Sequence, residues 1–165
     1  MKTFRLLFFM GIVLLVGGQS LFSQTKKEKR EQKEKEVKEL IDEKRFTIDV
    51  NRALPVGGRS VNLTSPYSFE MRGDSAVSYL PYFGRAYSVP YGGGDGMRFE
   101  KSVTDYSSSY NKKGIAQIKF VTRTDEDTYR FNIQVFPNGS ATINVTPTNR
   151  QSITYQGELA PKKKE

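Results

Sequence analysis

From Phe46 onward, apolar and polar residues alternate with a period of two, and no other feature of the sequence restricts the fold as strongly. The alternation is most regular at 129–135, where Tyr, Phe, Ile and Val occupy every second position. This pattern is typical of half-buried β-strands. Further strands are predicted at 46–50, 67–71, 76–81, 118–120, 141–145 and 153–159.

Turn signals separate these stretches. Gly73-Asp74, the polar residues 124–127 and Pro137-Asn138-Gly139 each fall between two predicted strands. Short strands joined by such turns predict a mainly β domain over residues 46–160, an antiparallel meander that forms a sandwich or an open barrel. The last strand, which contains Ile153 and Tyr155, is expected at an edge of the sheet.

Residues 24–45 form a different, charged segment before this domain. The run 25–45 has no Gly, Pro or aromatic residue, which favours a helix. Its apolar positions are Val37, Leu40 and Ile41, spaced for one helical face. We therefore predict one charged N-terminal α-helix whose last turns pack on the core. A coiled coil would need several apolar heptads.

The first 23 residues have the pattern of a secretory signal peptide. Lys2 and Arg5 precede an apolar run at 6–16, and small residues follow it. The run is short for a transmembrane helix. We expect cleavage after Ser23, and an exported mature chain with no transmembrane segment, located in the periplasm or outside the cell. No Cys follows the run, so the chain is not expected to be a lipoprotein.

The residue types that are missing exclude several kinds of chemistry. The chain has no Cys and no His. Thiol nucleophiles, Ser-His-Asp catalysis and most transition-metal sites are therefore closed to it. We expect no cofactor, no metal site and no catalytic residues, and we favour a binding or structural protein over an enzyme.

The positive charge is spread along the chain. The formal net charge falls from +8 to +6 when Lys2 and Arg5 leave with the signal peptide. Residues 25–45, 46–160 and the basic tail 161–165 each carry +2 of the remainder. Because no segment concentrates the charge, no nucleic-acid partner is expected.

The stretch 77–96 is rich in aromatic residues and glycine, and it supplies the candidate binding residues. Tyrosine rings suit stacking on sugars or gripping a peptide. Glycines allow the backbone to approach a ligand closely, and an arginine grips acidic or hydroxylated groups. Alternatively, Phe83 and some of the tyrosines belong to the core. The candidates for ligand binding are Tyr79, Tyr82, Arg85, Tyr87, Tyr91 and Asp95.

Two other functions are compatible with the composition. One is a glycan hydrolase that uses two carboxylates, with candidates Asp74, Asp95, Glu100 and Asp105. The other is a small β-barrel that carries an apolar ligand in its mouth. The acidic run 125–127 lacks the spacing of a calcium loop and is interpreted as a solvated turn.

Several of these segments together resemble a family of small exported proteins from anaerobic Gram-negative bacteria, domain-of-unknown-function family 4251. The resemblance covers about 46–159 and rests on the segments 57–60, 62–64, 73–75, 77–87, 91–96, 136–141 and 149–155. It implies an exported domain with no assigned activity. In such bacteria, Asp74-Ser75-Ala76 resembles an O-glycosylation acceptor, which makes Ser75 a candidate modification site. We expect an exported, envelope-associated binding or structural protein whose partners include envelope glycan or peptide.

Overall fold

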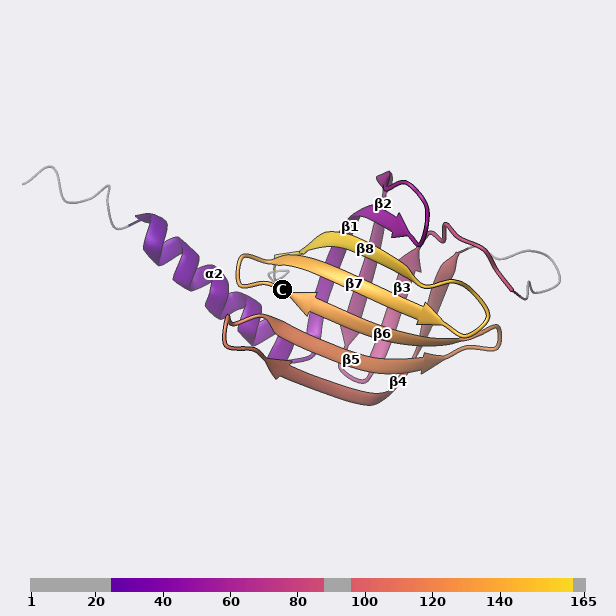
Figure 1. Cartoon of the computed structure of the whole chain (residues 1–165). Helices are drawn as coiled ribbons and strands as arrows, with labels where there is room; N and C mark the ends of the chain where they lie inside the picture. The colour runs from indigo at the N-terminus through magenta and orange to yellow at the C-terminus, as the bar shows by residue number, and fades with distance from the viewer. Residues whose placement is uncertain (1–24, 88–95, 162–165) are drawn as a thin grey trace, which may run out of the picture. The chain divides into compact units, whose positions relative to one another are not determined.

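The computed structural model of the chain describes residues 25–87 and 96–161. The predicted signal peptide, Tyr91 and Asp95 lie outside the described residues. The chain divides into two compact units, residues 1–32 and 33–165. Helix α2 (Thr25–Asp42) is followed by eight strands (Figure 1): β1 (Arg45–Pro55), β2 (Val61–Arg72), β3 (Ser75–Leu80), β4 (Met97–Tyr110), β5 (Ala116–Arg123), β6 (Thr128–Val135), β7 (Ser140–Pro147) and β8 (Ile153–Leu159).

The strands form a closed antiparallel barrel. Each strand pairs with the next along the chain, and β8 returns to pair with β1, from Ile48 opposite Leu159 to Pro55 opposite Ile153. The predicted meander and N-terminal helix are confirmed. The prediction of a sandwich or an open barrel was less precise than the closed barrel that is observed, in which the pairing of the first strand with the last leaves no open side. For the same reason β8 is not an edge strand.

The seam between β1 and β8 depends on a bulge and a glycine. The register of β1 shifts between Val50 and Arg52 against both of its neighbours. Gly157 lies opposite Val50, and a Cβ there would collide with the carbonyl oxygen of Asp49. A bulge bends and twists a strand, and a glycine permits close backbone approach. The two features together allow the barrel to close.

The longest strand, β4, is the one that the sequence pattern indicated least. Its residues are mostly exposed, so that the apolar alternation seen in the other strands is missing. The register against β5 also shifts between Thr104 and Ser107, where Asp105 has a φ of 54°. A bulge of this kind interrupts the period of two and hides the strand from pattern analysis.

Aromatic rings fill the interior of the barrel. The rings of Phe120 and Phe131 stack with centroids 4.8 Å apart, and Phe69 lies 5.3 Å from Phe131. Phe99 stacks on Tyr129 at 5.1 Å and joins this group through Phe131 at 6.2 Å. Such contacts add to the free energy gained from burial alone. At this level the space between the strands is therefore occupied by side chains.

The last turns of α2, which belong to the same unit as the barrel, pack against its core. Val37, Leu40 and Ile41 are buried and join the hydrophobic core, as their spacing predicts. The hydroxyl of Tyr110 donates a hydrogen bond to Asp42 Oδ1 at 2.7 Å and so links β4 to the helix. Among the described residues, no helix is long and apolar enough to span a bilayer.

The barrel has two ends, and the antiparallel order fixes which connections lie at each. The helix end carries α2 and the turns 73–74, 111–115 and 136–139. The loop end carries the connections 56–60, 81–96, 124–127 and 148–152 (Figure 1). Most of the candidate binding residues belong to the connection 81–96, so the loop end is the place to look for a site.

Candidate functional site

After β3 the chain leaves the barrel wall and runs along the β7–β8 loop. We call residues 81–87 the strap. The amide of Gln151 donates to the carbonyl oxygen of Arg85 at 3.0 Å, and the amide of Tyr87 donates to that of Asn149 at 2.8 Å. Ala86 and Arg150 form an isolated β-bridge between these bonds. The strap is thus held to the loop like a short added strand, and its backbone position is fixed.

Two tyrosine hydroxyls secure the beginning of the strap. The hydroxyl of the buried Tyr155 donates to the carbonyl oxygen of Pro81 at 2.6 Å. The hydroxyl of Tyr82 lies 2.9 Å from the carbonyl oxygen of Gln151 and 3.1 Å from that of Arg85, and it can donate to either. Burial raises the pKa of both tyrosines above its ordinary value. Their polar ends therefore serve the protein's own structure.

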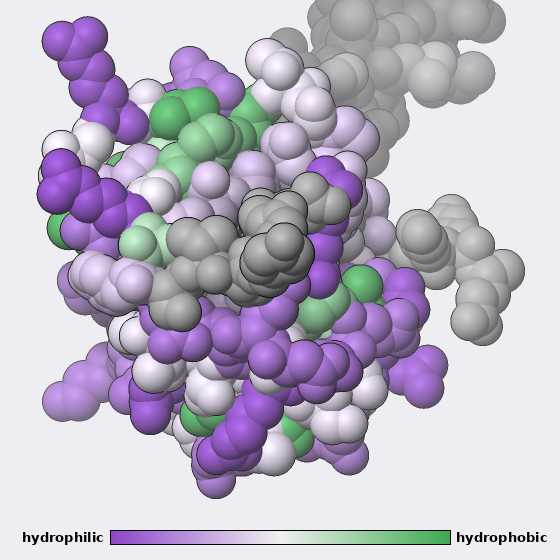
Figure 2. Space-filling model, turned by 90° about the vertical axis from the view of Figure 1, so that its right-hand side faces the viewer, coloured by the Kyte–Doolittle hydropathy of each residue, from purple (hydrophilic) through white to green (hydrophobic). Residues whose placement is uncertain are grey.

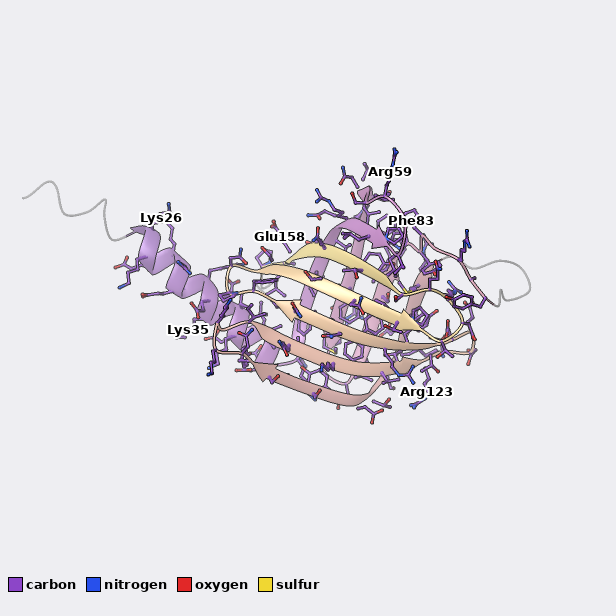
Figure 3. All side chains as sticks on the ribbon, viewed as in Figure 1. Lys26, Lys35, Arg59, Phe83, Arg123 and Glu158 are labelled. Carbon is purple, nitrogen blue, oxygen red and sulfur yellow. The ribbon has the colours of Figure 1, made fainter. Side chains whose placement is uncertain are left out.

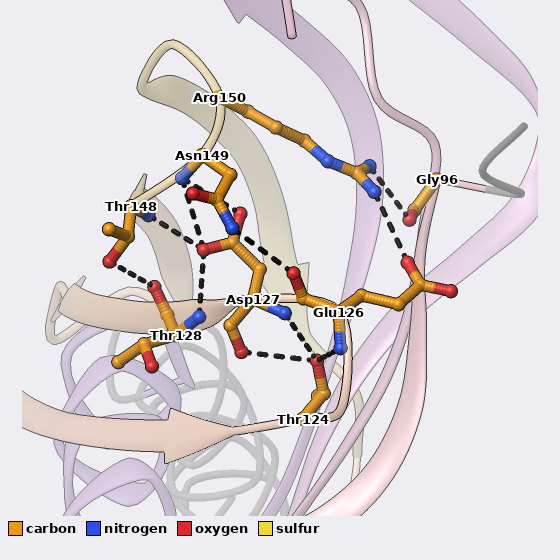
Figure 4. Close-up of polar contacts among 8 residues, drawn as sticks. All are labelled: Gly96, Thr124, Glu126, Asp127, Thr128, Thr148, Asn149 and Arg150. Atoms are coloured by element: carbon orange, nitrogen blue, oxygen red, sulfur yellow. Dashed lines mark hydrogen bonds and ion pairs between the residues drawn. The ribbon is translucent and has the colours of Figure 1, made fainter. Parts of the chain in front are cut away.

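A buried arginine connects the strap to the start of β4 (Figure 4). The side chain of Arg150 is 5% exposed. It donates to the carbonyl oxygen of Gly96 at 3.3 Å and to Glu126 Oε2 at 3.2 Å. Its guanidinium also lies 5.4 Å from the ring centroid of Tyr82. A buried charge must be paired and hydrogen-bonded to be tolerated, and these contacts meet that requirement.

Gly96 allows the chain to return to the barrel wall. Its φ is +83°, a conformation that favours glycine. A Cβ at this position would lie 2.6 Å from the carbonyl oxygen of Leu80. The segment therefore begins and re-enters the wall at one place, beside the last residue of β3.

A buried carboxylate organises the two neighbouring connections. Asp127 accepts hydrogen bonds from the backbone amides of Thr128 at 2.7 Å, Thr148 at 2.9 Å and Asn149 at 3.1 Å (Figure 4). Interpreting 125–127 as a solvated turn was therefore wrong for this residue, which is 5% exposed. The side chain of Asp125, by contrast, is 99% exposed.

The structure separates the candidate binding residues into groups. Tyr82 is half-buried, and its hydroxyl is hydrogen-bonded within the strap and the β7–β8 loop. Arg85 and Tyr87 point outward from the strap: Tyr87 is 72% exposed, and the Arg85 guanidinium has no hydrogen bond or ion pair with any described residue. The Tyr87 side chain has no hydrogen bond or ring contact with another side chain within the same described ranges, although it lies near enough to Tyr82 to influence that residue's pKa. Tyr91 and Asp95 lie outside those ranges.

Tyr79 lies on the outer wall of β3, not on the strap. Its ring stacks on Tyr67, with centroids 5.5 Å apart, and the guanidinium of Arg98 lies 4.4 Å from its centroid. The Arg98 side chain also donates to the Tyr79 hydroxyl at 3.2 Å. The ring is 39% exposed. Tyr67 and Arg98 were not among the predicted site residues, because their contacts with Tyr79 depend on the pairing of β3 with β2 and β4.

Ser75, the candidate modification site, begins β3 at the helix end, away from the strap. Its neighbour Asp74 is exposed and forms an ion pair with Lys44 at 3.1 Å. Ser75 itself is partly exposed. Its modification stays a prediction.

The carboxylates proposed for hydrolysis are found in different surroundings. Asp74 pairs with Lys44, and Glu100 lies 3.6 Å from Arg72 on the outer wall. Asp105 occupies the β4 bulge. Asp95 is not among the described residues. No observation places two of these acids across one cleft.

A groove at the helix end is the other hollow to consider. Leu40, Phe46 and Met71 lie at its walls together with charged residues of both signs, among them Arg45, Asp49 and Glu70. It has no cluster of tyrosines. The loop end, with its fixed strap and outward aromatic and guanidinium groups, is the better candidate.

The sequence missed the residues that support the strap. Asp127, Arg150 and Gln151 are polar residues in connections, where local pattern gives no reason to expect burial. Their role depends on two loops that are adjacent only in the folded barrel. No signal in the sequence alone would have identified them.

A family model described as "Domain of unknown function (DUF4251)" matches residues 28–159. Among solved structures, the chain is similar to a DUF4251 family protein from Bacteroides eggerthii, known from a crystal structure at 1.95 Å resolution. The two are 19% identical with a TM-score of 0.63, over 79% of this chain and 88% of the other. Among curated proteins no relative matches. At this identity the likeness shows the fold alone.

Proposed function

The chain belongs to the DUF4251 family, whose function is unknown, and on that premise we propose that it is an exported, envelope-associated binding protein. It contacts a glycan or a peptide through the strap. Export is supported by the basic, apolar and small residues that succeed one another at 1–23. Binding is supported by the geometry of the loop end.

The observation that carries the proposal is the pairing of a fixed backbone with free side chains. Two backbone hydrogen bonds and a tyrosine hydroxyl hold the strap. The side chains of Tyr87 and Arg85 are nevertheless exposed and make no hydrogen bond or ion pair with the described residues. A rigid base lowers the entropy lost when a ligand binds. Exposed tyrosine and arginine are also the residue types most enriched at binding hot spots.

The two rival functions receive less support. A barrel that carries an apolar ligand needs interior space, but rings of Phe69, Phe120 and Phe131 fill the middle of this one. A carboxylate-dependent hydrolase needs two acids about 5 to 10 Å apart across a cleft. In the described parts of the chain, the acids near the strap are engaged with Arg150 and with backbone amides.

Screening the purified protein on glycan and peptide arrays tests the proposal. We expect a hit that Tyr87→Ala weakens about tenfold or more, as truncation of an interface hot spot does. Val56→Ala is the matched control, because Val56 is also strongly exposed, at 60%, but lies on the β1–β2 connection. Thermal melting should show that both variants remain folded.

Two results would contradict the proposal. One is folded protein that binds nothing on either array. The other is a hit that Tyr87→Ala leaves unchanged, since the ligand would then contact another surface.

A further inference from the structure

Arginines gather at the loop end of the barrel, although they are scattered in the sequence. Seven of them lie in its connections or within three residues of a strand terminus there, and no described lysine does. The helix end has Arg45 and Arg72 but also several lysines, such as Lys44 after α2 and Lys112 and Lys113 between β4 and β5. Figure 3 shows Arg59 at the top of the view, Arg123 at the lower right, and Lys35 at the left beside α2. The seven are Arg52, Arg59, Arg85, Arg98, Arg123, Arg130 and Arg150.

Within the described ranges, the acids of the loop end leave six of these arginines without a carboxylate partner. Glu126 pairs with the buried Arg150, and Asp125 lies 3.7 Å from Lys101. Asp127 is occupied by backbone amides, and Glu100 by Arg72. The other six arginines are all exposed. Figure 2 views this end, where hydrophilic side chains cover most of the surface beside a smaller hydrophobic patch near the top, and long hydrophilic ones project from the margin.

Some of the six arginines lie close enough to share a ligand. Arg123 is opposite Thr128 in the β5–β6 register and Arg130 is opposite Val121, so the two arginines are diagonal neighbours. Diagonal neighbours of a sheet are about 7–8 Å apart. Arg85 and Tyr87 share the strap, and Arg98 lies against the ring of Tyr79. Guanidinium groups and tyrosine rings therefore occur together on the strap and on the wall beside it.

This combination favours one class of ligand. A guanidinium donates two parallel hydrogen bonds to a carboxylate or sulfate, whereas lysine acts as a point charge. Tyrosine offers a flat ring to a sugar and a hydroxyl to its edge. A peptide ligand would gain most from apolar pockets, yet Val56 is the one strongly exposed aliphatic side chain in the described part of this end.

We propose that the loop end binds an acidic polysaccharide, with arginines holding its anionic groups and Tyr87 stacking on a sugar ring. The inference rests on the proposed binding function and specifies its ligand. It extends the contact surface from the strap to arginines on β1, β4, β5 and β6.

The test measures binding of the purified protein to polygalacturonate, which is carboxylated, and to dextran, which is neutral. The double variant Arg59→Gln/Arg85→Gln removes two exposed arginines whose side chains make no hydrogen bond or ion pair with the described residues. The control Lys112→Gln/Lys113→Gln removes the same charge at the helix end, where both lysines are exposed. Vesicles of anionic phospholipid and an acidic peptide serve as competing anions.

We expect polygalacturonate to bind and dextran to bind far more weakly. The arginine double variant should weaken binding about tenfold or more, and the lysine control less than about twofold. Added salt should weaken the interaction, since exposed charges are screened.

Each other outcome overturns the inference in a recognisable way. Equal binding of both polysaccharides, lost in Tyr87→Ala, would leave the proposed function intact and refute an acidic ligand. If the arginine and lysine double variants weakened polygalacturonate binding equally, the binding would depend on net charge and not on the arginines of the loop end. Binding only to vesicles or to the acidic peptide would assign the surface to another partner. No binding to any probe would refute the inference, and the array screen would then decide the proposed function separately.

Discussion

At the scale of single residues, the loop end depends on a few buried polar groups. Asp127 is the clearest, because one carboxylate satisfies amides from both the β6 terminus and the β7–β8 loop. That loop in turn holds the strap through Asn149 and Gln151. Substituting Asp127 should therefore also disturb the positions of the outward-facing residues of the strap.

Replacing Asp127 with alanine should lower the free energy of unfolding by about 3 kcal/mol, because three partly buried backbone hydrogen bonds lose their charged acceptor. Asp127→Asn should cost less, since one acceptor oxygen remains. Urea denaturation would measure both changes.

The neighbouring Asp125→Ala provides the control. Its side chain is 99% exposed and its ion pair with Lys101 is long, at 3.7 Å, so the change should be within about 0.5 kcal/mol. Equal effects at the two positions would show that Asp127 does not have the role assigned to it.

At the scale of elements, closure of the barrel depends on the fit between β1 and β8. Val50 and Gly157 meet at the bulge of β1, where the two backbones approach most closely. The same strand, β8, also carries Tyr155, whose hydroxyl secures the strap. Packing at the seam and the position of the candidate site are thus linked through one strand.

Gly157→Ala should destabilise the protein by about 3 kcal/mol or more, because the added methyl group collides with backbone atoms that cannot rotate away. Chemical denaturation, or the yield of folded protein, would show the loss.

Gly58→Ala is the matched glycine control. It lies in an exposed turn, and its added Cβ would meet Pro55 at 3.4 Å, so its effect should be about 1 kcal/mol or less. A Gly157→Ala protein as stable as the parent would contradict the account of the seam.

At the scale of the whole molecule, tyrosines contribute to the interior as well as to the surface. Burial raises the pKa of five of the nine tyrosines above the ordinary value of 10.0, and for Tyr110 the hydrogen bond to Asp42 raises it further. The five are Tyr82, Tyr106, Tyr110, Tyr129 and Tyr155. The folded protein thus holds these phenolic protons more tightly than the unfolded chain.

Stability should therefore be retained below about pH 10 and fall as the pH rises above it, because the unfolded chain loses protons first. Urea unfolding between about pH 8 and about pH 11 would show the decline. Tyrosinate absorbance should rise at higher pH in the folded protein than in urea. Coincident absorbance curves in the two states would contradict burial as the cause.

The sequence by itself determined the local structure of most elements. The period of two in 129–135 and 141–145 specifies strands because side-chain direction alternates within each strand, whatever its partner. The spacing of Val37, Leu40 and Ile41 likewise specifies the buried face of the helix. Most of β4 was missed, since its bulge and exposed serines remove the alternation.

Only the tertiary structure decided which strands and connections lie next to one another. Closure joins the first strand to the last, a contact that no local pattern encodes. Arg150 and Asp127 became buried because three distant connections meet at one end. The positive charge is evenly spread along the sequence. An antiparallel meander nevertheless brings alternate connections to the same end of the barrel, and seven arginines lie at or near the connections of the loop end. Pairing over long sequence separations therefore created the candidate site.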